Sequence, residues 1–368
     1  MLANFNLIKS NILLLVNLFQ EENMATSVIK AFDDFMKETV NLDQSRVATA
    51  RNSRNWLLDR IASFPENDMS FPILHNEYNL NYGSFERKTK TRPLDDIDMM
   101  IGIKADGCTY IETNVNDVKI YFPDHYNGRL NAFRHTTYGK ESTLSSTRVV
   151  NKFVKNLGEI DQYSKAEIKR TGEAATLKLI SYEWNFDLLP CFMTTSESDG
   201  RSYYLIPNGN GDWKKTDPRK DRARLSSINQ SCNGYVLNVI RAFKYWNQRP
   251  YQTRLPSYLL ETMISDYYQN EIHYSRSSQV SKYVDMEFIK VLEYLIDNIY
   301  LTVHDPKDIT YNINDLNFEH QQSMRTRLSV TLEKARLARQ YESDTKPKES
   351  IKKWREIFGD NFPEYTGT

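Results

Sequence analysis

The chain has 368 residues, 40% of them hydrophobic, so it is long enough to bury the core of one large two-lobed enzyme or of two ordinary domains. Lys and Arg together number 48, as do Asp and Glu, and the formal net charge is zero. Proteins that grip long nucleic acids rely on clustered cations to neutralise phosphates. The charge balance argues against that class, and we expect no extended nucleic acid as a partner.

The cysteine content and the N-terminal stretch bear on the compartment. The three cysteines, Cys108, Cys191 and Cys232, form no CxxC pair and have no histidine at zinc-ligand spacing. This usage is typical of the reducing cytoplasm, where we place the protein. The apolar run 12–19 is shorter than a membrane span of about 20 residues and has no small-residue cleavage site after it. We therefore expect no membrane partner.

Apolar side chains recur at three- and four-residue steps over residues 24–64, which predicts helices there. Residues 81–191 instead contain short runs rich in Ile, Val, Tyr and Phe, separated by Gly, Pro, Asn and Asp, as is typical of a mixed sheet. Helical periodicity returns after residue 207. Its clearest segments are 235–246, 258–268 and 286–300.

The polar segment 341–350 resembles a solvated linker before a last helix that contains Trp354. The pattern as a whole predicts three parts: a peripheral extension over residues 1–23, a sheet-bearing core with its N-terminal helix over residues 24–206, and a helical lobe over residues 207–368. The predicted fold class is therefore α/β.

Two aspartates alternate with apolar residues in one predicted strand. Alternate side chains of a strand share a face, so Asp96 and Asp98 point one way while Ile97 and Met99 point into a core. Two like charges about 4 Å apart repel by roughly 4 kcal/mol at an effective dielectric constant near 20. A cation between them removes this repulsion, and oxygen ligands favour Mg²⁺ or Mn²⁺.

A third acid is needed if two metal ions are to clamp a phosphoryl transfer, because such ions share carboxylates. Asp187 is the candidate. Its segment places Trp184 and Phe186 on one face and Asn185 and Asp187 on the other. If this strand lies beside the first, Asp187 joins the other two acids.

A Gly-Ser pair precedes the acids in the chain. Gly83 lets backbone N–H groups approach a phosphate closely, and Ser84 can donate its hydroxyl to the same oxygens. Such a pair is also typical of an ordinary turn. Its position just before Asp96 and Asp98 favours a phosphate-binding role.

This assembly resembles the polymerase-beta-like nucleotidyltransferase superfamily, in which Gly-Ser is followed by an acid-hydrophobic-acid strand and by a third acid on a later strand. Within it the chain is similar to the CD-NTases, the group that contains cyclic GMP-AMP synthase and its bacterial antiphage (CBASS) relatives. The narrower similarity is carried by residues 186–192, 213–218, 241–247, 255–261 and 354–363.

The resemblance implies a mixed nucleotidyltransferase sheet with a long N-terminal helix, followed by a mostly helical C-terminal lobe. It implies that Asp96, Asp98 and Asp187 are catalytic and bind two Mg²⁺ or Mn²⁺ ions. Gly83, Ser84, Lys244, Ser257 and Tyr258 would bind nucleotide, Lys244 and Ser257 at the donor triphosphate and Tyr258 by stacking on the donor base.

The implied activity is template-independent condensation of nucleoside triphosphates into a cyclic di- or trinucleotide that signals phage infection to a downstream effector. We expect a monomer. The chain lacks the His-Cys-Cys-Cys insertion of the animal enzyme, which argues against activation by double-stranded DNA. Two alternatives stay open: a nucleotidyltransferase acting on RNA ends or on a protein, and a non-catalytic nucleotide-binding sensor.

Overall fold

The computed structural model describes residues 24–140, 142–250, 252–274 and 280–367. The predicted extension over residues 1–23 lies outside them. The chain divides into two compact units. The sheet unit comprises Gln44–Ser226 and His304–Tyr311, and the helical unit comprises the described parts of Met1–Asp43, Ser227–Val303 and Asn312–Thr368.

The sheet unit is built on a nine-stranded mixed sheet with the order β2-β3-β8-β9-β10-β5-β4, to which β7 and β6 are added at β8. Its strands are β2 (Leu80–Tyr82), β3 (Asp96–Gly102), β4 (Thr109–Asn114), β5 (Asp117–Tyr121), β6 (Glu167–Thr171), β7 (Ala174–Lys178), β8 (Asn185–Met193), β9 (Tyr204–Pro207) and β10 (Trp213–Thr216). The first half of β8 pairs with β7 and its last residues pair with β9, so the sheet branches along this strand. Two of the strands, β9 and β10, lie beyond the predicted sheet region 81–191.

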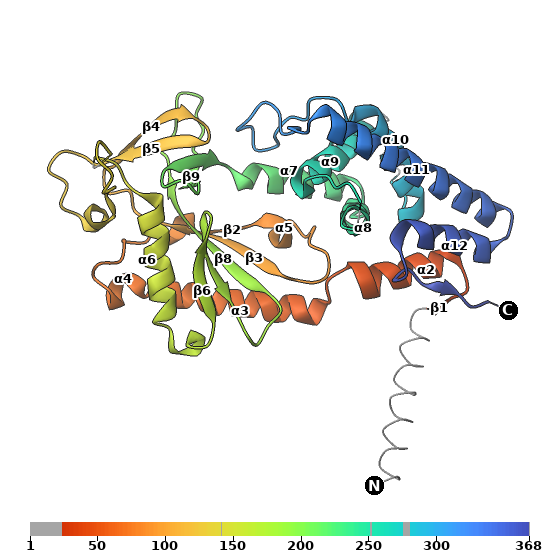
Figure 1. The fold of residues 1–368 in the computed structure, drawn as a ribbon, viewed down its shortest axis with the longest axis horizontal. Helices are drawn as coiled ribbons and strands as arrows, with labels where there is room; N and C mark the ends of the chain where they lie inside the picture. Colours follow the sequence, from red (N-terminus) through yellow and green to blue (C-terminus); the bar gives the residue numbers. More distant parts are fainter. Residues whose placement is uncertain (1–23, 141, 251, 275–279, 368) are drawn as a thin grey trace, which may run out of the picture. The chain divides into compact units, whose positions relative to one another are not determined.

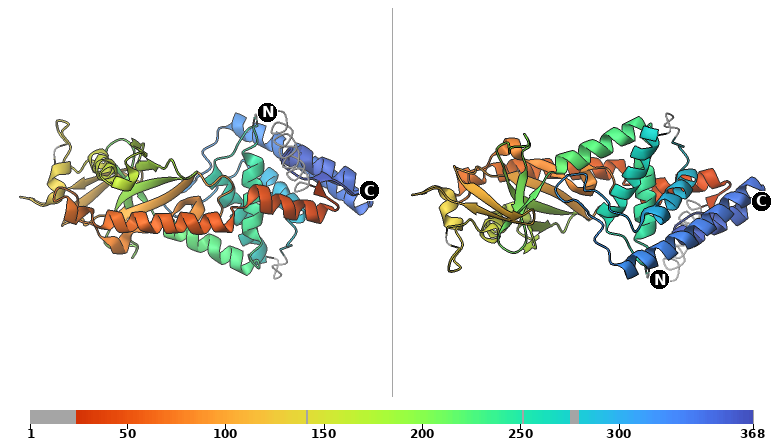
Figure 2. Two further views of the ribbon diagram at one scale, coloured as in Figure 1. Left: turned by 90° about the horizontal axis from the view of Figure 1, so that it is seen from below. Right: turned by 90° about the horizontal axis from the view of Figure 1, so that it is seen from above.

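Helices of the same unit accompany the sheet. They are α3 (Gln44–Ala62), α4 (Phe64–Asn67), η2 (Asn76–Tyr78), α5 (Gly83–Glu86), η3 (Arg129–Phe133), α6 (Ser146–Gly158) and η4 (Asp161–Tyr163), followed by the start of α7 (Pro218–Ser231). The 19-residue α3 runs alongside the sheet in each view (Figures 1 and 2). This is the long N-terminal helix that the sequence predicts.

The helical unit confirms the expected helix-rich C-terminal region. It contains α2 (Val28–Asp34), η1 (Phe35–Val40), α8 (Val236–Asn247), α9 (Ser257–Tyr274), α10 (Val284–Asn298), α11 (Phe318–Ser343) and α12 (Pro347–Phe358), and β1 (Met24–Ala25) pairs in parallel with β11 (Glu364–Tyr365). Among the described residues, none of the helices combines the length and the apolar character needed to cross a bilayer.

The two compact units divide the chain at other places than the predicted boundary after residue 206. Residues 24–43 belong with the C-terminal helices because Phe32 packs edge-on against Trp354, with ring centroids 4.9 Å apart, and Phe35 lies 4.9 Å from Phe358. These large rings are buried and bury much apolar area. Residues 207–226 belong with the sheet, since β10 is one of its strands.

The prediction of a linker over residues 341–350 is wrong for most of its length. The helix α11 continues to Ser343, where Arg339 pairs with Asp285 at 2.8 Å and also with Glu342. The next helix begins at Pro347, a residue suited to a first helical turn because its missing N–H is not needed there. Polar composition therefore marks the solvent face of these helices rather than a loop.

Candidate active site

The three predicted acids lie on two neighbouring strands of the sheet unit. Strands β3 and β8 pair in parallel, and their register places Asp98 opposite Asp187 and Asp96 opposite Asn185. Residues opposite each other on paired strands project from the same face. The structure thus brings the side chains of Asp96, Asp98 and Asp187 to one face of the sheet.

The alternation that motivated this prediction is confirmed by burial. On β3, Ile97 is 1% exposed and Met99 is fully buried, whereas Asp96 and Asp98 are half-buried. On β8, Phe186 and Leu188 are fully buried on either side of Asp187. The apolar residues fix both strands, so the carboxylates are held by a rigid support.

The row of residues continues across the sheet on both sides of the aspartates. Tyr82 of β2 lies opposite Asp98, and Thr176 of β7 lies opposite Asp187. The Thr176 hydroxyl donates a hydrogen bond of 2.6 Å to Oδ1 of Asp187. Because one oxygen of Asp187 is held in this way, the orientation of the whole carboxylate is fixed.

A lysine balances part of the negative charge. Lys90 forms ion pairs with Asp95 and with Asp96, and its ammonium donates a hydrogen bond to Oδ1 of Asp96. Burial lowers the pKa of Lys90, but the two carboxylates outweigh burial and raise it overall. Lys90 therefore remains a cation beside Asp96.

The Gly83-Ser84 pair lies at the end of β2, in the one-turn helix α5. Gly83 has a φ of +75°, and a Cβ at this position would lie 2.7 Å from Cγ of Asp98. Only glycine fits here without displacing the aspartate. The Ser84 side chain makes no hydrogen bond to any described residue, so its hydroxyl is available to a ligand.

Ion pairs fasten the chain that follows α5. Arg87 pairs with the buried Asp221 of α7 at 3.3 Å, and Glu86 pairs with Arg54 of α3 and Arg222 of α7, each at 3.3 Å. Residues 219–224, a charged run in the sequence, therefore include two ion-pair partners of this segment. They anchor the turn that carries Gly83.

The electrostatics of the site centre on Asp98. Burial, followed by the negative charges of Asp96 and Asp187, raises the pKa of Asp98 to about 7. Burial and the charge of Asp98 also raise the pKa of the neighbouring Tyr82 well above its usual value. Lys90 therefore does not fully offset the negative charge that gathers on this face.

This imbalance predicts a pH-dependent gain in stability for the variant Asp98→Asn in EDTA. Below about pH 4 the carboxyl is protonated in both the folded and the unfolded chain, so variant and wild type should be equally stable. Between about pH 4 and pH 7 the carboxyl of Asp98 is ionised in the unfolded wild type but protonated in the folded wild type. The free energy of unfolding of the wild type therefore falls as the pH rises through this range. The free energy of unfolding of the variant should then exceed that of the wild type by about 2 to 4 kcal/mol above pH 7.

Urea denaturation at pH 4 and at pH 8 measures this difference. Asp59→Asn, which changes an exposed aspartate of α3, is the matched control and should show no such gain. An equal stability of Asp98→Asn and wild type at pH 8 would show that the charge of Asp98 is already balanced.

The donor set suits a divalent cation. Asp96, Asp98 and Asp187 offer hard carboxylate oxygens, and the raised pKa of Asp98 marks a site that is short of positive charge. In the described conformation no three Asp, Glu, His or Cys side chains converge closely enough to hold a metal, across the residues that the structure describes. Asp96 is engaged by Lys90 and Asp187 by Thr176.

The remaining predicted contacts, Lys244, Ser257 and Tyr258, belong to the helical unit. Lys244 of α8 is 4% exposed and donates a hydrogen bond of 2.6 Å to Glu261 of α9. Ser257, the first residue of α9, is exposed, and Tyr258 is half-buried. Lys244 is thus the least accessible of the three.

Sequence reasoning did not single out Lys90, Thr176 or Tyr82. Lys90 stands between the Gly-Ser pair and the acids, and a basic residue in that interval could have been flagged. Thr176 and Tyr82 are brought to the site by strand pairing, which places them opposite Asp187 and Asp98. No spacing in the sequence reveals which residue faces Asp187 across the sheet.

No protein-family model matches the chain. A Bacillus cereus (strain VD146) protein named as a probable cyclic nucleotide synthase is 39% identical over 343 residues, which cover 93% of this chain and 99% of the relative. The Enterobacter hormaechei cyclic AMP-AMP-GMP synthase is 21% identical over 312 residues, or 76% of this chain and 79% of that protein.

A solved structure with the same fold is that of E. coli MS115-1 CdnC with ATP, with a TM-score of 0.64 at 14% identity over 91% of this chain and 98% of that one. Identity this low shows the fold alone, whereas the B. cereus relative shows the family. The polymerase-beta-like mixed sheet, the long N-terminal helix and the helical C-terminal region agree with the fold of that solved structure. The chain therefore belongs to the CD-NTase family, the nucleotidyltransferases related to cyclic GMP-AMP synthase.

Proposed function

We propose that this protein condenses nucleoside triphosphates into a cyclic di- or trinucleotide without a template, releasing pyrophosphate. The observation that carries the proposal is the register of β3 and β8, which sets Asp98 opposite Asp187 and leaves Asp96 on the same face. Family membership supports it independently. The reaction is attack by a ribose hydroxyl on the α-phosphate of a bound triphosphate.

The proposed roles follow from the surroundings of each side chain. Asp96 and Asp98 would hold the cation of the donor triphosphate, and Asp187, whose carboxylate accepts a hydrogen bond from Thr176, would help to hold a second cation beside the attacking ribose hydroxyl. Two Mg²⁺ or Mn²⁺ ions, when bound, supply the positive charge that stabilises the transferring phosphoryl group and lowers the pKa of the attacking hydroxyl. Gly83 admits the phosphates beside Asp98, and Ser84 donates its hydroxyl to them.

The contacts proposed for the helical unit are carried over from the family resemblance. Ser257 donates to the triphosphate and Tyr258 stacks on the donor base. Lys244 contacts the triphosphate as a point charge. Its hydrogen bond to Glu261 uses one of three ammonium donors, which leaves two for a phosphate.

The test is incubation of the purified full-length protein with each labelled nucleoside triphosphate and with their mixture, in Mg²⁺ or Mn²⁺, followed by phosphatase treatment. A phosphatase-resistant small product is expected. Elongation of added RNA, or labelling of a protein, would replace the proposal by one of those two transferase activities. Binding of nucleotide without any incorporation would identify a non-catalytic sensor.

Thr176 offers a test of how Asp187 is positioned. Thr176→Val keeps the β-branched shape but removes the hydrogen bond to a charged oxygen, so the Mg²⁺ concentration for half-maximal activity should rise about tenfold. Thr176→Ser restores the hydroxyl and should restore the wild-type value. A Val variant with unchanged Mg²⁺ dependence would mean that Asp187 is oriented by other contacts.

We further propose that the protein works in the cytoplasm and that its product acts on a downstream effector in antiphage signalling, as the family resemblance implies. The absence of disulfides supports the compartment, since Cys108, Cys191 and Cys232 are free thiols. Phage plaque counts on cells that express the gene with its genomic neighbours measure the role. Protection that survives Asp98→Asn would dissociate defence from catalysis.

A further inference from the structure

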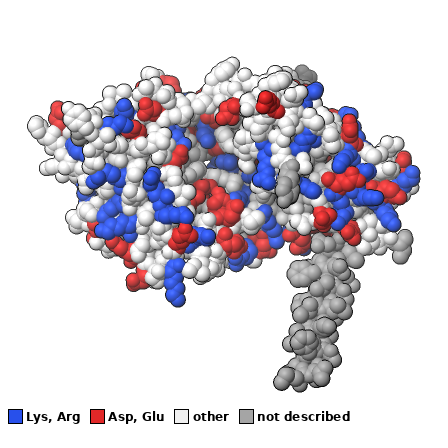
Figure 3. Space-filling model, in the orientation of Figure 1, with Lys and Arg blue, Asp and Glu red and all other residues white. Residues whose placement is uncertain are grey.

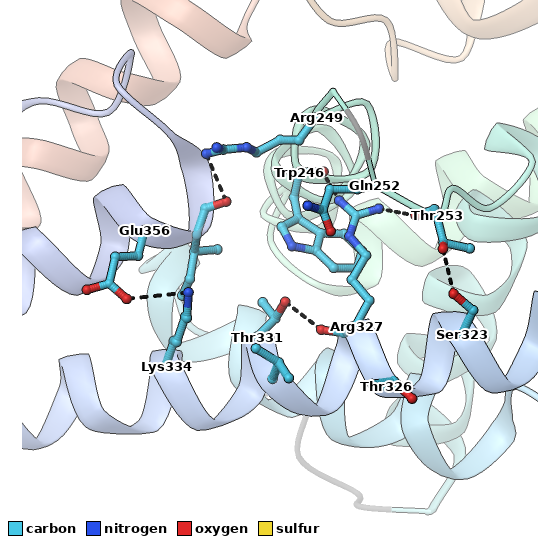
Figure 4. Close-up of a pocket in the computed structure, with 12 residues that line it drawn as sticks. Trp246, Arg249, Gln252, Thr253, Ser323, Thr326, Arg327, Thr331, Lys334 and Glu356 are labelled. Carbon is cyan, nitrogen blue, oxygen red and sulfur yellow. Dashed lines mark hydrogen bonds and ion pairs between the residues drawn. The ribbon is translucent and has the colours of Figure 1, made fainter.

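The helical unit contains a hollow of about 410 Å³ that has no part in the proposed nucleotide chemistry. Its walls are the end of α8, the loop residues Arg249, Gln252 and Thr253, the middle of α11 and the end of α12 (Figure 4). Small-molecule sites in proteins typically occupy about 300 to 1,000 Å³. The hollow is therefore of a size that a small ligand fills.

The lining of this hollow contains three cationic side chains and one carboxylate. Arg249 comes from the loop after α8, and Arg327 and Lys334 come from α11. Glu356 of α12 lies 3.4 Å from Lys334. Figure 4 shows Arg327 and Lys334 rising from α11, with Arg249 on the opposite side of the hollow. An excess of two positive charges remains.

The described residues give the two arginines no carboxylate partner. Arg327 donates to the main-chain oxygens of Trp246 and Thr253, and its guanidinium lies 3.9 Å from the centroid of the Trp246 ring. Arg249 makes one side-chain hydrogen bond to a described residue, to the main-chain oxygen of Ile357 at 3.3 Å. Burial and the charges of Arg249 and Arg254 lower the pKa of Arg327 to about 10. These cations repel one another, and a bound anion would relieve that repulsion.

The rest of the lining is suited to an anion that carries an apolar group. The hydroxyls of Thr253 and Ser323 share a hydrogen bond of 2.6 Å, which leaves one hydroxyl of the pair able to donate to a ligand, while the Thr326 hydroxyl donates to the main-chain oxygen of Gln322. The aliphatic residues of the lining are Val330, which is 47% exposed, and Ile357, which is 4% exposed. Hydroxyl and guanidinium donors match the oxygens of a phosphate, and the aliphatic side chains match a carbon skeleton.

We propose that this hollow is a binding site for a small organic phosphate, separate from the aspartate site and independent of metal. Arg249 and Lys334 contact the phosphate oxygens, while Arg327 and Trp246 form the floor. None of these residues is assigned to the condensation of nucleotides. The site lies wholly inside the helical unit, so binding does not depend on the proposed activity.

The test is isothermal titration of the full-length protein with phenyl phosphate in EDTA, which prevents metal-dependent binding at the aspartates. Arg249→Gln and Lys334→Gln should each weaken binding roughly tenfold, the loss expected for one charge-assisted hydrogen bond. Arg325→Gln, which changes an exposed arginine of the same helix α11 outside the hollow, is the matched control and should bind as the wild type does. Circular dichroism checks that each variant is folded.

Three further measurements decide the outcome. Asp98→Asn should bind phenyl phosphate as tightly as the wild type, which separates this site from the aspartate site. Inorganic phosphate should bind more weakly than phenyl phosphate, and equal binding would overturn the role of Val330 and Ile357. Undiminished binding by both Gln variants, or tighter binding of an acidic peptide than of phenyl phosphate, would overturn the proposal.

Discussion

Asp98→Asn should lower the rate of nucleotide condensation by about 10³-fold or more while the protein remains folded. The asparagine keeps the shape of the side chain and removes its charge. A bound metal contributes several kcal/mol of transition-state stabilisation, and each 1.36 kcal/mol corresponds to a tenfold change in rate. Asp98 lies between Gly83 and Asp187, so it is the central acid of the row.

Initial rates of pyrophosphate release in Mg²⁺ measure this effect. Asp59→Asn carries the same chemical change on the exposed side of α3 and should retain full activity. Asp98→Asn should therefore combine two results. Its condensation rate in Mg²⁺ should be far below that of the wild type, and its free energy of unfolding in EDTA above pH 7 should be higher. A variant that keeps more than a tenth of the wild-type rate would remove Asp98 from the proposed site.

Gly83→Ala is expected to lower the condensation rate about 10²-fold, because a misplacement of catalytic groups by about 1 Å can have that effect. The added Cβ would lie 2.7 Å from Cγ of Asp98, so either the turn or the aspartate must move. The φ of +75° also strains any residue other than glycine, which costs about 1 to 2 kcal/mol of stability.

Gly200→Ala is the control that separates backbone strain at positive φ from the displacement of Asp98. Gly200 has nearly the same φ, +77°, and a Cβ there would have no neighbour within 4 Å. The control should therefore show a comparable loss of thermal stability with an unchanged condensation rate. Equal rates for Gly83→Ala and wild type would indicate that Asp98 tolerates displacement, against the proposed role of Gly83.

The sequence predicts the strand-borne part of the site because strand periodicity is local. Ile97 and Met99 must face a core, and this alone directs Asp96 and Asp98 to the other face. The same reasoning orients Asp187. That Asp187 comes to lie directly opposite Asp98 depends on the order and register of the strands, which are properties of the whole sheet.

The features that the sequence did not predict depend on contacts between residues that are far apart in the chain. Thr176 reaches Asp187 only through the pairing of β7 with β8. The hydrophobic pattern of residues 24–43 does not say that Phe32 will meet Trp354 rather than the sheet. Charge balance over the whole chain also conceals local imbalance. Lys, Arg, Asp and Glu side chains are spread over the face drawn in Figure 3, and yet the aspartate face and the hollow near Arg327 have opposite excess charge.

The helical unit combines residues 24–43 with segments that follow the sheet unit in the chain. Its parts are therefore synthesised at different times. Residues 24–43 leave the ribosome before the sheet unit does, whereas β11 and the aromatic rings of α12 that pack against them leave after it. Most of the sheet unit is complete before those partners exist. The apolar face of α2 must therefore stay open to chaperones until α12 and β11 have been synthesised, and deletion of residues 347–365 should leave it uncovered.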